Sequence, residues 1–505
     1  MNEFITFDQS LPVFASLVAS KLGKQALQDH FFLRDVSGRL TFVVSDDALD
    51  ENQRATLAGE AAARLPNYVD PDGFAVATPS ELFDERLRNP DGALTLTVKD
   101  GPATWVVRVI DRRMVGADWL RTPSAFRCHP SRLAFVSLKG GVGRSTALCV
   151  LAAELAAEGR RILTIDLDLE APGLGNMLLV EETLPKFGLL DYLVERSLSP
   201  IDDDFVVDMV ATSWLGGGRG LVDVVPAIGS ISTKHPENVL GKIARAYLAD
   251  SDTQGATTTF TDHVAALLTR LTDLRTYDAV LIDARAGLHE TTAAAIVGLG
   301  ADVLCFGLDQ PQTYAGYKLL FAHLSTLPTP NCDAINALAT SKIAGEVQST
   351  DVVAQTDDTE RSDGVLPPRA EDDLADDWRD RLRFVHAKAS GDSTSQKRFN
   401  EWASALLRAT LLPTPNPLER DIDVSPLSDE FDVIWDQQTL PTVPVSPDSD
   451  GMALVAKILD DSRYASFDPL VKFELLERSI YETTYGSFLS ECKEILKLDQ
   501  SGAGQ

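Results

Sequence analysis

The sequence has few cysteines and no long apolar run. Its 505 residues include five cysteines, an odd number scattered along the chain, which argues against a disulfide framework and favours reduced thiols. No segment reaches the roughly 18 uninterrupted apolar residues of a membrane span, and the first residues lack the basic start and apolar core of a secretion signal. We therefore expect a cytoplasmic protein that has no membrane attachment.

Basic residues are scarce relative to acidic ones. The chain has 46 Lys and Arg against 75 Asp and Glu, a formal net charge of −29. Because this charge repels phosphate backbones and anionic lipids, nonspecific DNA binding and membrane binding are both disfavoured. A local basic excess is either an ordinary solvated surface or a docking site for nucleic acid or an acidic partner segment. It consists of Arg108, Arg112, Arg113, Arg121, Arg127 and Arg132.

The length predicts more than one domain, and a hydrophobic fraction of 44% can fill large cores. Residues 1–125 alternate strand-like and helical stretches, which predicts an α+β domain of unknown role. Over residues 130–445, strands and helices alternate around a glycine-rich loop, which predicts an α/β domain with a mostly parallel sheet and helices on both faces. We also predict a flexible acidic insertion at about residues 351–380 and a helical C-terminal region at 446–505. The predicted strands of the sheet are LAFVSL, RILTID, LVDVVPA, DAVLID, DVLCFGL and LRFVHA.

A glycine-rich turn, SLKGGVGRST at residues 137–146, follows the first of these strands and opens a helix. In such a turn the backbone N–H groups converge on a phosphate, and the positive end of the helix adds to the attraction. The pattern predicts a phosphate cradle. Its residues are Lys139, Gly140, Gly141, Val142, Gly143, Arg144, Ser145 and Thr146.

This turn resembles the deviant Walker A box of the ParA/MinD family of P-loop ATPases, KGGVGK[ST]T, which it matches at every position except Arg144. Two further motifs follow in the family's order. LTIDLDLEAPGLG places Asp166 and Asp168 at the end of a strand, and YDAVLIDARAGL places Asp283 in the same way. Ligands of open α/β sheets bind beyond the carboxyl ends of the strands, so the three motifs are expected to meet there. The residues after Asp283 depart from the family, which has a proline-containing turn.

The resemblance implies ATP and Mg²⁺ as cofactors. Asp168 would position the attacking water, while Ser145, Asp166 and Asp283 would hold the Mg²⁺. Lys139 would cross to the partner's nucleotide in an ATP-dependent homodimer, so Lys139 and Arg144 join Asp168 as expected catalytic residues. Arginine keeps the charge of the family's lysine but is longer, planar and forked. We therefore expect nucleotide binding to survive better than turnover.

The leading hypothesis is a molecular switch that binds Mg-ATP, dimerises, hydrolyses ATP slowly and signals to an unidentified protein partner, as part of a bacterial regulatory or phage-defence system. Two alternatives stay open: a hydrolytically inactive ATP-binding scaffold protein, and a ParA-type DNA-partitioning motor, which the net charge disfavours. His289 and Glu290 begin a zinc-helix pattern but lack its second histidine, which argues against a zinc site there.

Overall fold

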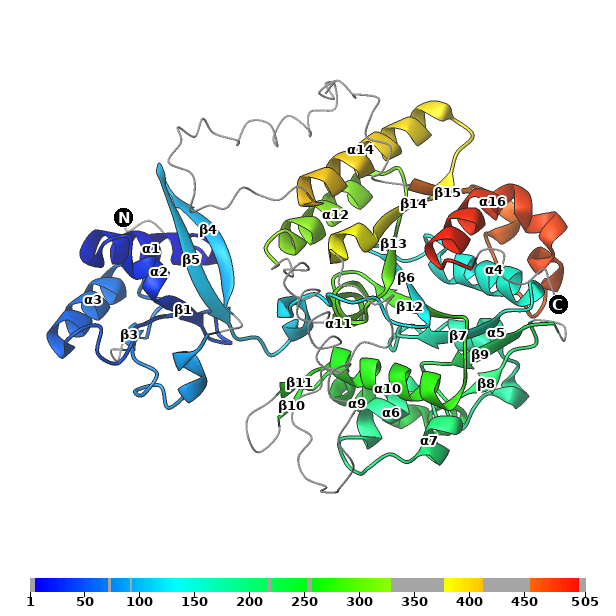
Figure 1. The fold of residues 1–505 in the computed structure, drawn as a ribbon, viewed down its shortest axis with the longest axis horizontal. Helices are drawn as coiled ribbons and strands as arrows, with labels where there is room; N and C mark the ends of the chain where they lie inside the picture. Colours follow the sequence, from blue (N-terminus) through cyan, green and yellow to red (C-terminus); the bar gives the residue numbers. More distant parts are fainter. Residues whose placement is uncertain are drawn as a thin grey trace, which may run out of the picture.

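The computed structural model describes residues 5–70, 74–90, 93–215, 219–251, 257–327, 377–411 and 455–498. The predicted acidic insertion at about 351–380 lies outside this part of the chain except for its last four residues. The described residues form three β-sheets: one of five strands in the N-terminal segment, a larger one of eight strands after it, and a two-stranded one made of β10 and β11 (Figure 1). The four cysteines that the structure describes are all unpaired.

The N-terminal sheet has five strands in the order β3-β2-β1-β5-β4. Its turns at Ser37-Gly38 and Asp100-Gly101 join antiparallel pairs, β1 to β2 and β4 to β5. Phe14, Phe32 and Phe42 are fully buried where the first helix packs on the sheet. The elements are α1 (Phe7–Leu22), α2 (Ala26–Asp29), β1 (Phe31–Arg34), β2 (Leu40–Val43), α3 (Glu51–Arg64), β3 (Val76–Ala77), η1 (Glu85–Arg88), β4 (Leu94–Asp100) and β5 (Ala103–Asp111).

The larger sheet has eight strands in the order β15-β14-β13-β6-β12-β7-β9-β8. All neighbouring strands are parallel except β8 and β9. All six predicted strands occur in it, so the predicted P-loop type of α/β fold is confirmed. The strands are β6 (Ser131–Ser137), β7 (Arg161–Asp166), β8 (Ala211–Thr212), β9 (Leu221–Val225), β12 (Ala279–Ala286), β13 (Asp302–Gly307), β14 (Leu382–Ala389) and β15 (Val455–Leu459).

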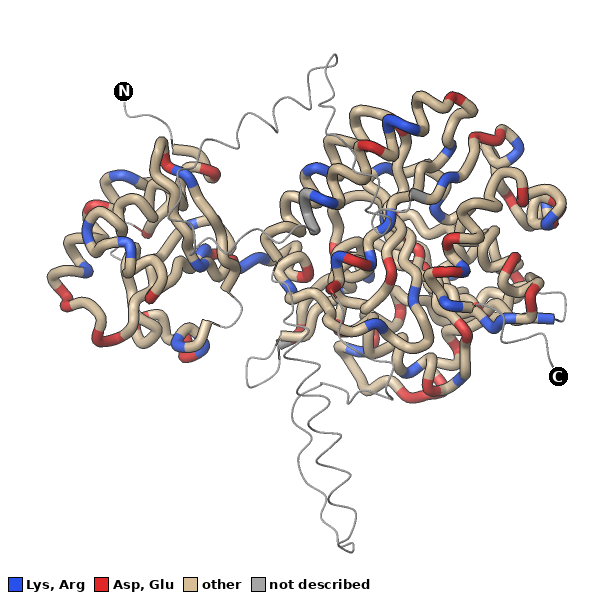
Figure 2. Tube along the Cα trace, turned by 45° about the horizontal axis from the view of Figure 1, so that its top comes forward, with Lys and Arg blue, Asp and Glu red and all other residues tan. Residues whose placement is uncertain are grey.

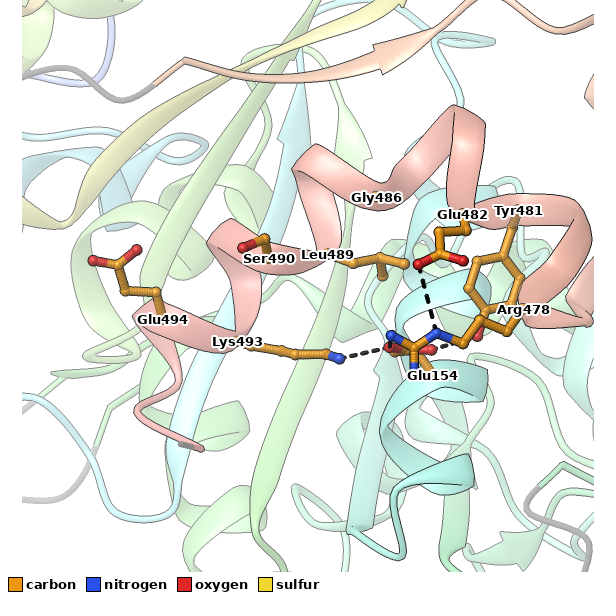
Figure 3. A pocket seen from close by; sticks show the side chains of 9 residues that line it. All are labelled: Glu154, Arg478, Tyr481, Glu482, Gly486, Leu489, Ser490, Lys493 and Glu494. Atoms are coloured by element: carbon orange, nitrogen blue, oxygen red, sulfur yellow. Dashed lines mark hydrogen bonds and ion pairs between the residues drawn. The ribbon is translucent and has the colours of Figure 1, made fainter. Parts of the chain in front are cut away.

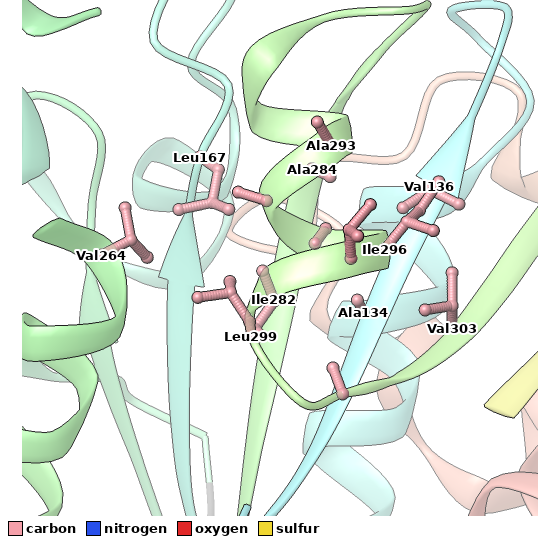
Figure 4. Close-up of a cluster of buried hydrophobic side chains, with 14 of the residues drawn as sticks. Ala134, Val136, Leu167, Val264, Ile282, Ala284, Ala293, Ile296, Leu299 and Val303 are labelled. Carbon is pink, nitrogen blue, oxygen red and sulfur yellow. The ribbon is translucent and has the colours of Figure 1, made fainter. Parts of the chain in front are cut away.

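Helices cover both faces of this sheet because its central strands are apolar on both sides. Along β6, Leu133 and Phe135 face one buried cluster, whereas Ala134 and Val136 face the other. Figure 4 shows part of the second cluster, where Ala134 and Val136 lie near Ile282 and Val303 of the neighbouring strands. The helices on that face are α6 (Leu189–Glu195), α9 (Val239–Ala246), α10 (Phe260–Leu274), α11 (Glu290–Ala293), a π-helical turn (Ala294–Gly298), α12 (Pro311–Leu324) and α14 (Ser393–Leu411). The helices on the opposite face are α4 (Arg144–Ala157), α5 (Leu174–Leu178) and α16 (Arg478–Ile495).

Short elements occupy the long connections on either side of β9. They are η3 (Glu181–Thr183), α7 (Asp203–Val207), α8 (Ser230–Lys234), η4 (Pro236–Asn238), β10 (Asp250–Ser251) and β11 (Thr257–Thr258). The remaining 3-10 turns are η2 (Ala117–Leu120), η6 (Trp378–Arg381), η9 (Ser462–Tyr464) and η10 (Phe473–Leu476).

The C-terminal region contains the expected helix and an unexpected strand. Helix α16 buries Phe488 against Phe135 and Phe306 of the sheet. Strand β15 pairs in parallel with β14 and forms one edge of the sheet. Residues 455–498 are therefore packed into the larger sheet and its helical layer.

The basic excess between the five-stranded sheet and the eight-stranded sheet is engaged internally. Arg121 forms a two-pronged ion pair with Asp262 of α10, and Arg127 pairs with Asp302 at the start of β13. Arg132 donates to the carbonyl oxygen of Leu299. The other three arginines likewise contact oxygens of the protein, at Asp29, Asp84 and Asp111. Figure 2 shows basic and acidic residues interspersed along the described chain.

Candidate phosphate-binding site

The P-loop joins the end of β6 to the start of α4. Gly141 and Gly143 have φ values of +73° and +94°, in the left-handed region that favours glycine. Helix α4 begins at Arg144 without a side-chain cap, so no side chain occupies its first N–H groups. The structure thus places the eight predicted cradle residues, 139–146, at one turn whose helix end attracts an anion.

The three motifs meet at the carboxyl ends of three adjacent strands. Strand β12 lies between β6 and β7, and Asp283 is in register with Asp166. The Ser145 hydroxyl donates to Oδ2 of Asp283 over 2.5 Å, which links the P-loop directly to β12. This convergence is the arrangement expected from the order of the motifs.

The second oxygen of Asp283 is poised for a further partner. Oδ1 of Asp283 is buried and has no hydrogen-bond partner among the described residues. Burial raises the pKa of Asp283, although the nearby Arg144 and the hydrogen bond from Ser145 oppose the shift. A buried carboxylate with a free oxygen beside a hydroxyl matches the oxygen ligands that Mg²⁺ prefers.

Asp166 is fully buried beside Asp283 and holds the following loop. Its Oδ1 accepts from the N–H of Asp168 over 3.0 Å, and its Oδ2 accepts from the N–H groups of Gly173 and Leu174 over 3.1 and 3.0 Å. Burial and the charge of Asp283 raise the pKa of Asp166. Both carboxylate oxygens of Asp166 therefore accept hydrogen bonds from the loop, and the role of Asp166 as a Mg²⁺ ligand stays a prediction.

Asp168 lies between two arginines. Its Oδ2 is 3.9 Å from Nη2 of Arg144, and its Oδ1 is 4.0 Å from Nε of Arg285. Burial raises the pKa of Asp168, and the two guanidinium groups partly offset this effect. Asp168 is buried, but less completely than Asp166 and Asp283.

The side chain of Arg144 turns inward from the P-loop. It is only 9% exposed, and its Nη1 donates to the carbonyl oxygen of Ala284 at the end of β12. The guanidinium therefore lies between β12 and Asp168. The sequence predicted a positive charge at this position, but it could not predict this direction.

Lys139 lies on the exposed side of the P-loop. Its Nζ contacts the side-chain oxygens of Gln312 and Gln310, at 3.2 and 3.5 Å, at the N-terminal end of α12. Lys139 is exposed.

The sequence analysis missed Lys388, which lies at the C-terminal end of β14 and contacts the P-loop. Its Nζ donates to the carbonyl oxygen of Gly141 over 2.9 Å, and its own φ of +48° is unusual for a residue with a side chain. A small cavity of about 70 Å³ lies beside this contact, between the P-loop residues Val142–Thr146 and the C-terminal segment. Tyr464 and Tyr485 line the cavity on the C-terminal side.

A larger cavity, of about 450 Å³, lies between α4 and α16 (Figure 3). The carboxylate of Glu154, on α4, accepts most of the polar contacts in this cavity. Tyr481 and Lys493 both donate to it over 2.5 Å, and Arg478 lies 3.7 Å away. Burial would raise the pKa of Glu154, but the hydrogen bonds from Lys493 and Tyr481 outweigh it and hold the pKa below its usual value. This network fixes α16 to the helix that begins at the P-loop.

Comparison with known proteins agrees with the fold. Residues 131–320 match the model of a protein family described as AAA domain. Together with the strand order and the three motifs, this match confirms the resemblance of this segment to ParA/MinD-like P-loop ATPases. No curated protein matches the chain. Among the described residues, no helix has the length and apolar character needed to span a membrane.

Several solved structures resemble part of the chain. MinD of Pyrococcus horikoshii, in complex with Mg-ADP, is 20% identical over 39% of this chain, with a TM-score of 0.28; the match spans 66% of MinD, just under two thirds. A putative plasmid partition protein of Borrelia burgdorferi, bound to AMPPNP, is 14% identical over 73% of this chain and 98% of its own, with a TM-score of 0.34. An McdA variant from Cyanothece, in complex with ATP, is 13% identical over 73% of this chain and 97% of its own, with a TM-score of 0.35.

Proposed function

We propose, on the basis of the P-loop ATPase fold of residues 131–320, that this protein is a Mg-ATP-dependent molecular switch that hydrolyses ATP slowly. The single observation that carries the proposal is the contact between Ser145 of the P-loop and Asp283 of β12. It joins a phosphate cradle to a buried carboxylate that keeps one oxygen free. A hydroxyl of a P-loop and a carboxylate oxygen at the same sheet edge are the oxygen ligands that a Mg²⁺–phosphate site uses.

Residues 139–146 would hold the triphosphate, chiefly through backbone N–H groups at the start of α4. Ser145 and Asp283 would hold Mg²⁺, with Asp166 fixing the loop that carries Asp168. The metal supplies charge neutralisation at the phosphate oxygens. Asp168, bracketed by guanidinium groups, would orient the water whose oxygen attacks the terminal phosphorus, so that the bond to the bridging oxygen breaks and ADP and inorganic phosphate leave.

Two further elements of the proposal concern assembly. Lys139 is exposed at the P-loop, so it can reach nucleotide bound to a second copy of the chain. ATP binding would then close a homodimer, and an unidentified protein partner would distinguish the closed state from the open one. Nucleotide can shift this equilibrium only by the difference between its affinities for the two states.

Calorimetry with ATP and Mg²⁺, followed by phosphate release, tests binding and hydrolysis separately. We expect binding of ATP and ADP, and a slow release of phosphate that Asp168→Ala reduces to background. Sizing the protein with and without Mg-ATP tests dimer formation, with Lys139→Ala as the variant expected to stay monomeric. Absence of any nucleotide binding by folded protein contradicts the whole proposal.

One observation favours a second function, a hydrolytically inactive ATP-binding scaffold. The inward direction of Arg144 places its guanidinium on Ala284 and Asp168. If the guanidinium stays there when nucleotide is bound, the transferring phosphate lacks the cation that a P-loop normally provides. In that case the protein binds ATP, and its phosphate release equals that of Asp168→Ala.

The ParA-type DNA motor is the weakest of the three functions. The arginines that could have made a basic patch, Arg121 and Arg127 among them, are paired with carboxylates of the protein. Salt-sensitive, ATP-dependent retention on DNA would support the motor nevertheless.

A further inference from the structure

We propose that Arg285 contacts the terminal phosphate of the bound nucleotide, and that Glu170 competes with this phosphate for the Arg285 guanidinium. The inference rests on the proposed ATP binding and assigns a residue to the recognition of the third phosphate. It concerns the departure after Asp283, where the sequence continues Ala284-Arg285-Ala286-Gly287.

The backbone of Arg285 is fixed at the edge of the P-loop. The preceding residue, Ala284, accepts a hydrogen bond from Arg144. The N–H of Gly287 donates to the carbonyl oxygen of Ser137 over 2.9 Å, and Thr292 donates to the Arg285 carbonyl oxygen over 3.0 Å. With the main chain held on both sides, only the side chain of Arg285 needs to move to reach a ligand at the P-loop.

The guanidinium of Arg285 lies between two carboxylates. Nη1 is 2.8 Å from Oε1 of Glu170, and Nε is 4.0 Å from Oδ1 of Asp168. Asp168 in turn lies 3.9 Å from Arg144 of the P-loop. Arg285 is therefore separated from the phosphate cradle by a single carboxylate, and it is 32% exposed, so it has room to rotate.

The carboxylate of Glu170 has two further contacts besides its ion pair with Arg285. Its Oε2 accepts from the Tyr247 hydroxyl over 3.1 Å, and its Oε1 lies 3.5 Å from Nε2 of His289. The rings of Tyr247 and His289 pack edge to face with centroids 4.8 Å apart. Tyr247 lies directly after α9, and His289 lies directly before α11. Loss of the ion pair between Arg285 and Glu170 would therefore change a contact at the end of α9 and another at the start of α11.

Competition between Glu170 and the phosphate gives the site its selectivity. A forked guanidinium forms strong, charge-assisted hydrogen bonds with either a carboxylate or a phosphate, but it forms its best geometry with one at a time. A triphosphate brings a further doubly charged group to the mouth of the site, where Asp168 and Arg285 lie. A diphosphate lacks that group and leaves Arg285 with Glu170. Arg285 thus distinguishes ATP from ADP.

The test compares affinities for AMPPNP and ADP, each with Mg²⁺, by calorimetry. We expect Arg285→Ala to weaken AMPPNP binding about ten-fold while ADP binding changes less than about two-fold. Glu170→Gln, which leaves Arg285 in place, should strengthen AMPPNP binding about three-fold or more without affecting ADP binding. Arg270→Ala is the matched control, because Arg270 of α10 has a similar exposure, 31%, and pairs with Asp203 of α7.

The outcomes separate the assignment of Arg285 from the proposed nucleotide binding. If Arg285→Ala and Glu170→Gln both leave the ratio of the two affinities at the wild-type value, the assignment of Arg285 is wrong although the protein binds nucleotide. If the wild-type protein binds neither nucleotide, the proposed function fails and the assignment fails with it. Should Arg285→Ala not fold, Arg285→Lys and Glu170→Gln still measure the ratio.

Discussion

The ammonium group of Lys388 donates a hydrogen bond to the carbonyl oxygen of Gly141, 2.9 Å away, across a sequence separation of 247 residues. The end of β14 therefore supports the P-loop through one of the loop's carbonyl oxygens. Because Lys388 and the P-loop both border the cavity that reaches the C-terminal segment, the contact ties three distant stretches of sequence together.

We expect Lys388→Met to weaken ADP binding about three- to ten-fold, because it removes a charge-assisted hydrogen bond that orders the loop. Calorimetry measures the effect. Lys457→Met is the control: Lys457 lies on the adjacent strand β15 and contacts Gln396 instead of the P-loop. Equal affinities for the two variants would mean that Lys388 contributes nothing to nucleotide binding.

Arg144→Lys restores the family's residue and should accelerate ATP hydrolysis about ten-fold or more. A lysine forms one compact charge and has no second donor arm to hold it at Ala284 and Asp168, so it can follow the transferring phosphate. Phosphate release at saturating ATP measures the rate, and Asp168→Ala gives the background. A rate equal to that of the wild-type protein would show that Arg144 does not limit turnover.

Ser145→Ala should abolish the part of nucleotide binding that depends on Mg²⁺. In the wild-type protein we expect the melting temperature to rise with ADP and to rise further when Mg²⁺ is added, since ligands that bind the folded state stabilise it. Without the Ser145 hydroxyl beside Asp283, the second increase should disappear. Ser20→Ala, which removes a hydroxyl from α1, should keep both increases. A full Mg²⁺ effect in Ser145→Ala would exclude this hydroxyl as a metal ligand.

Glu154→Gln should lower the free energy of unfolding at pH 7 by about 1–3 kcal/mol, because Lys493 of α16 then loses one of its two carboxylate partners and keeps only Glu158. The folded-state pKa of Glu154 lies below its value in the unfolded chain. Its stabilisation is thus complete above the unfolded pKa and is lost as the pH falls through the folded pKa.

Chemical denaturation between pH 7 and pH 3 measures this pH dependence. The wild-type protein should lose more stability over the range than Glu154→Gln does. As a control, Glu482→Gln changes an exposed carboxylate 3.9 Å from Arg478 and should have little effect at either pH. Parallel curves for wild type and Glu154→Gln would contradict the role given to this carboxylate.

Six strands of the larger sheet, and the sheet edge at which the motifs end, could be predicted from the sequence; the order of the strands across the sheet was not predicted. Asp283 follows an uninterrupted apolar run at residues 279–282, and Asp166 follows a run that only Thr164 interrupts; such runs are typical of strands buried on both faces. Parallel strands end at the same edge of a sheet, so the P-loop and Asp283 were expected at one edge. Their direct contact also needs β6 and β12 to be neighbours in the sheet, which the structure shows.

The pattern could not predict strand β15 or the contact made by Lys388. VAKIL is five residues long, within a region otherwise predicted as helical, and it becomes a strand because it pairs with the exposed edge of β14. Lys388 resembles any other surface lysine in sequence. Its significance comes from the left-handed backbone at the end of β14 and the nearness of Gly141, both of which depend on tertiary structure.

The position of β15 and α16 beside the P-loop has a consequence for biosynthesis. On the ribosome, the glycine-rich turn emerges long before Val455–Leu459 and Arg478–Ile495 are made. Until then the nascent sheet lacks its last strand, and the hydrophobic side of α4 lacks the cover that Phe488 and its neighbours provide. Tight capture of a ligand at that turn should therefore be a property of the finished chain, and a ribosome-bound intermediate should require protection by chaperones.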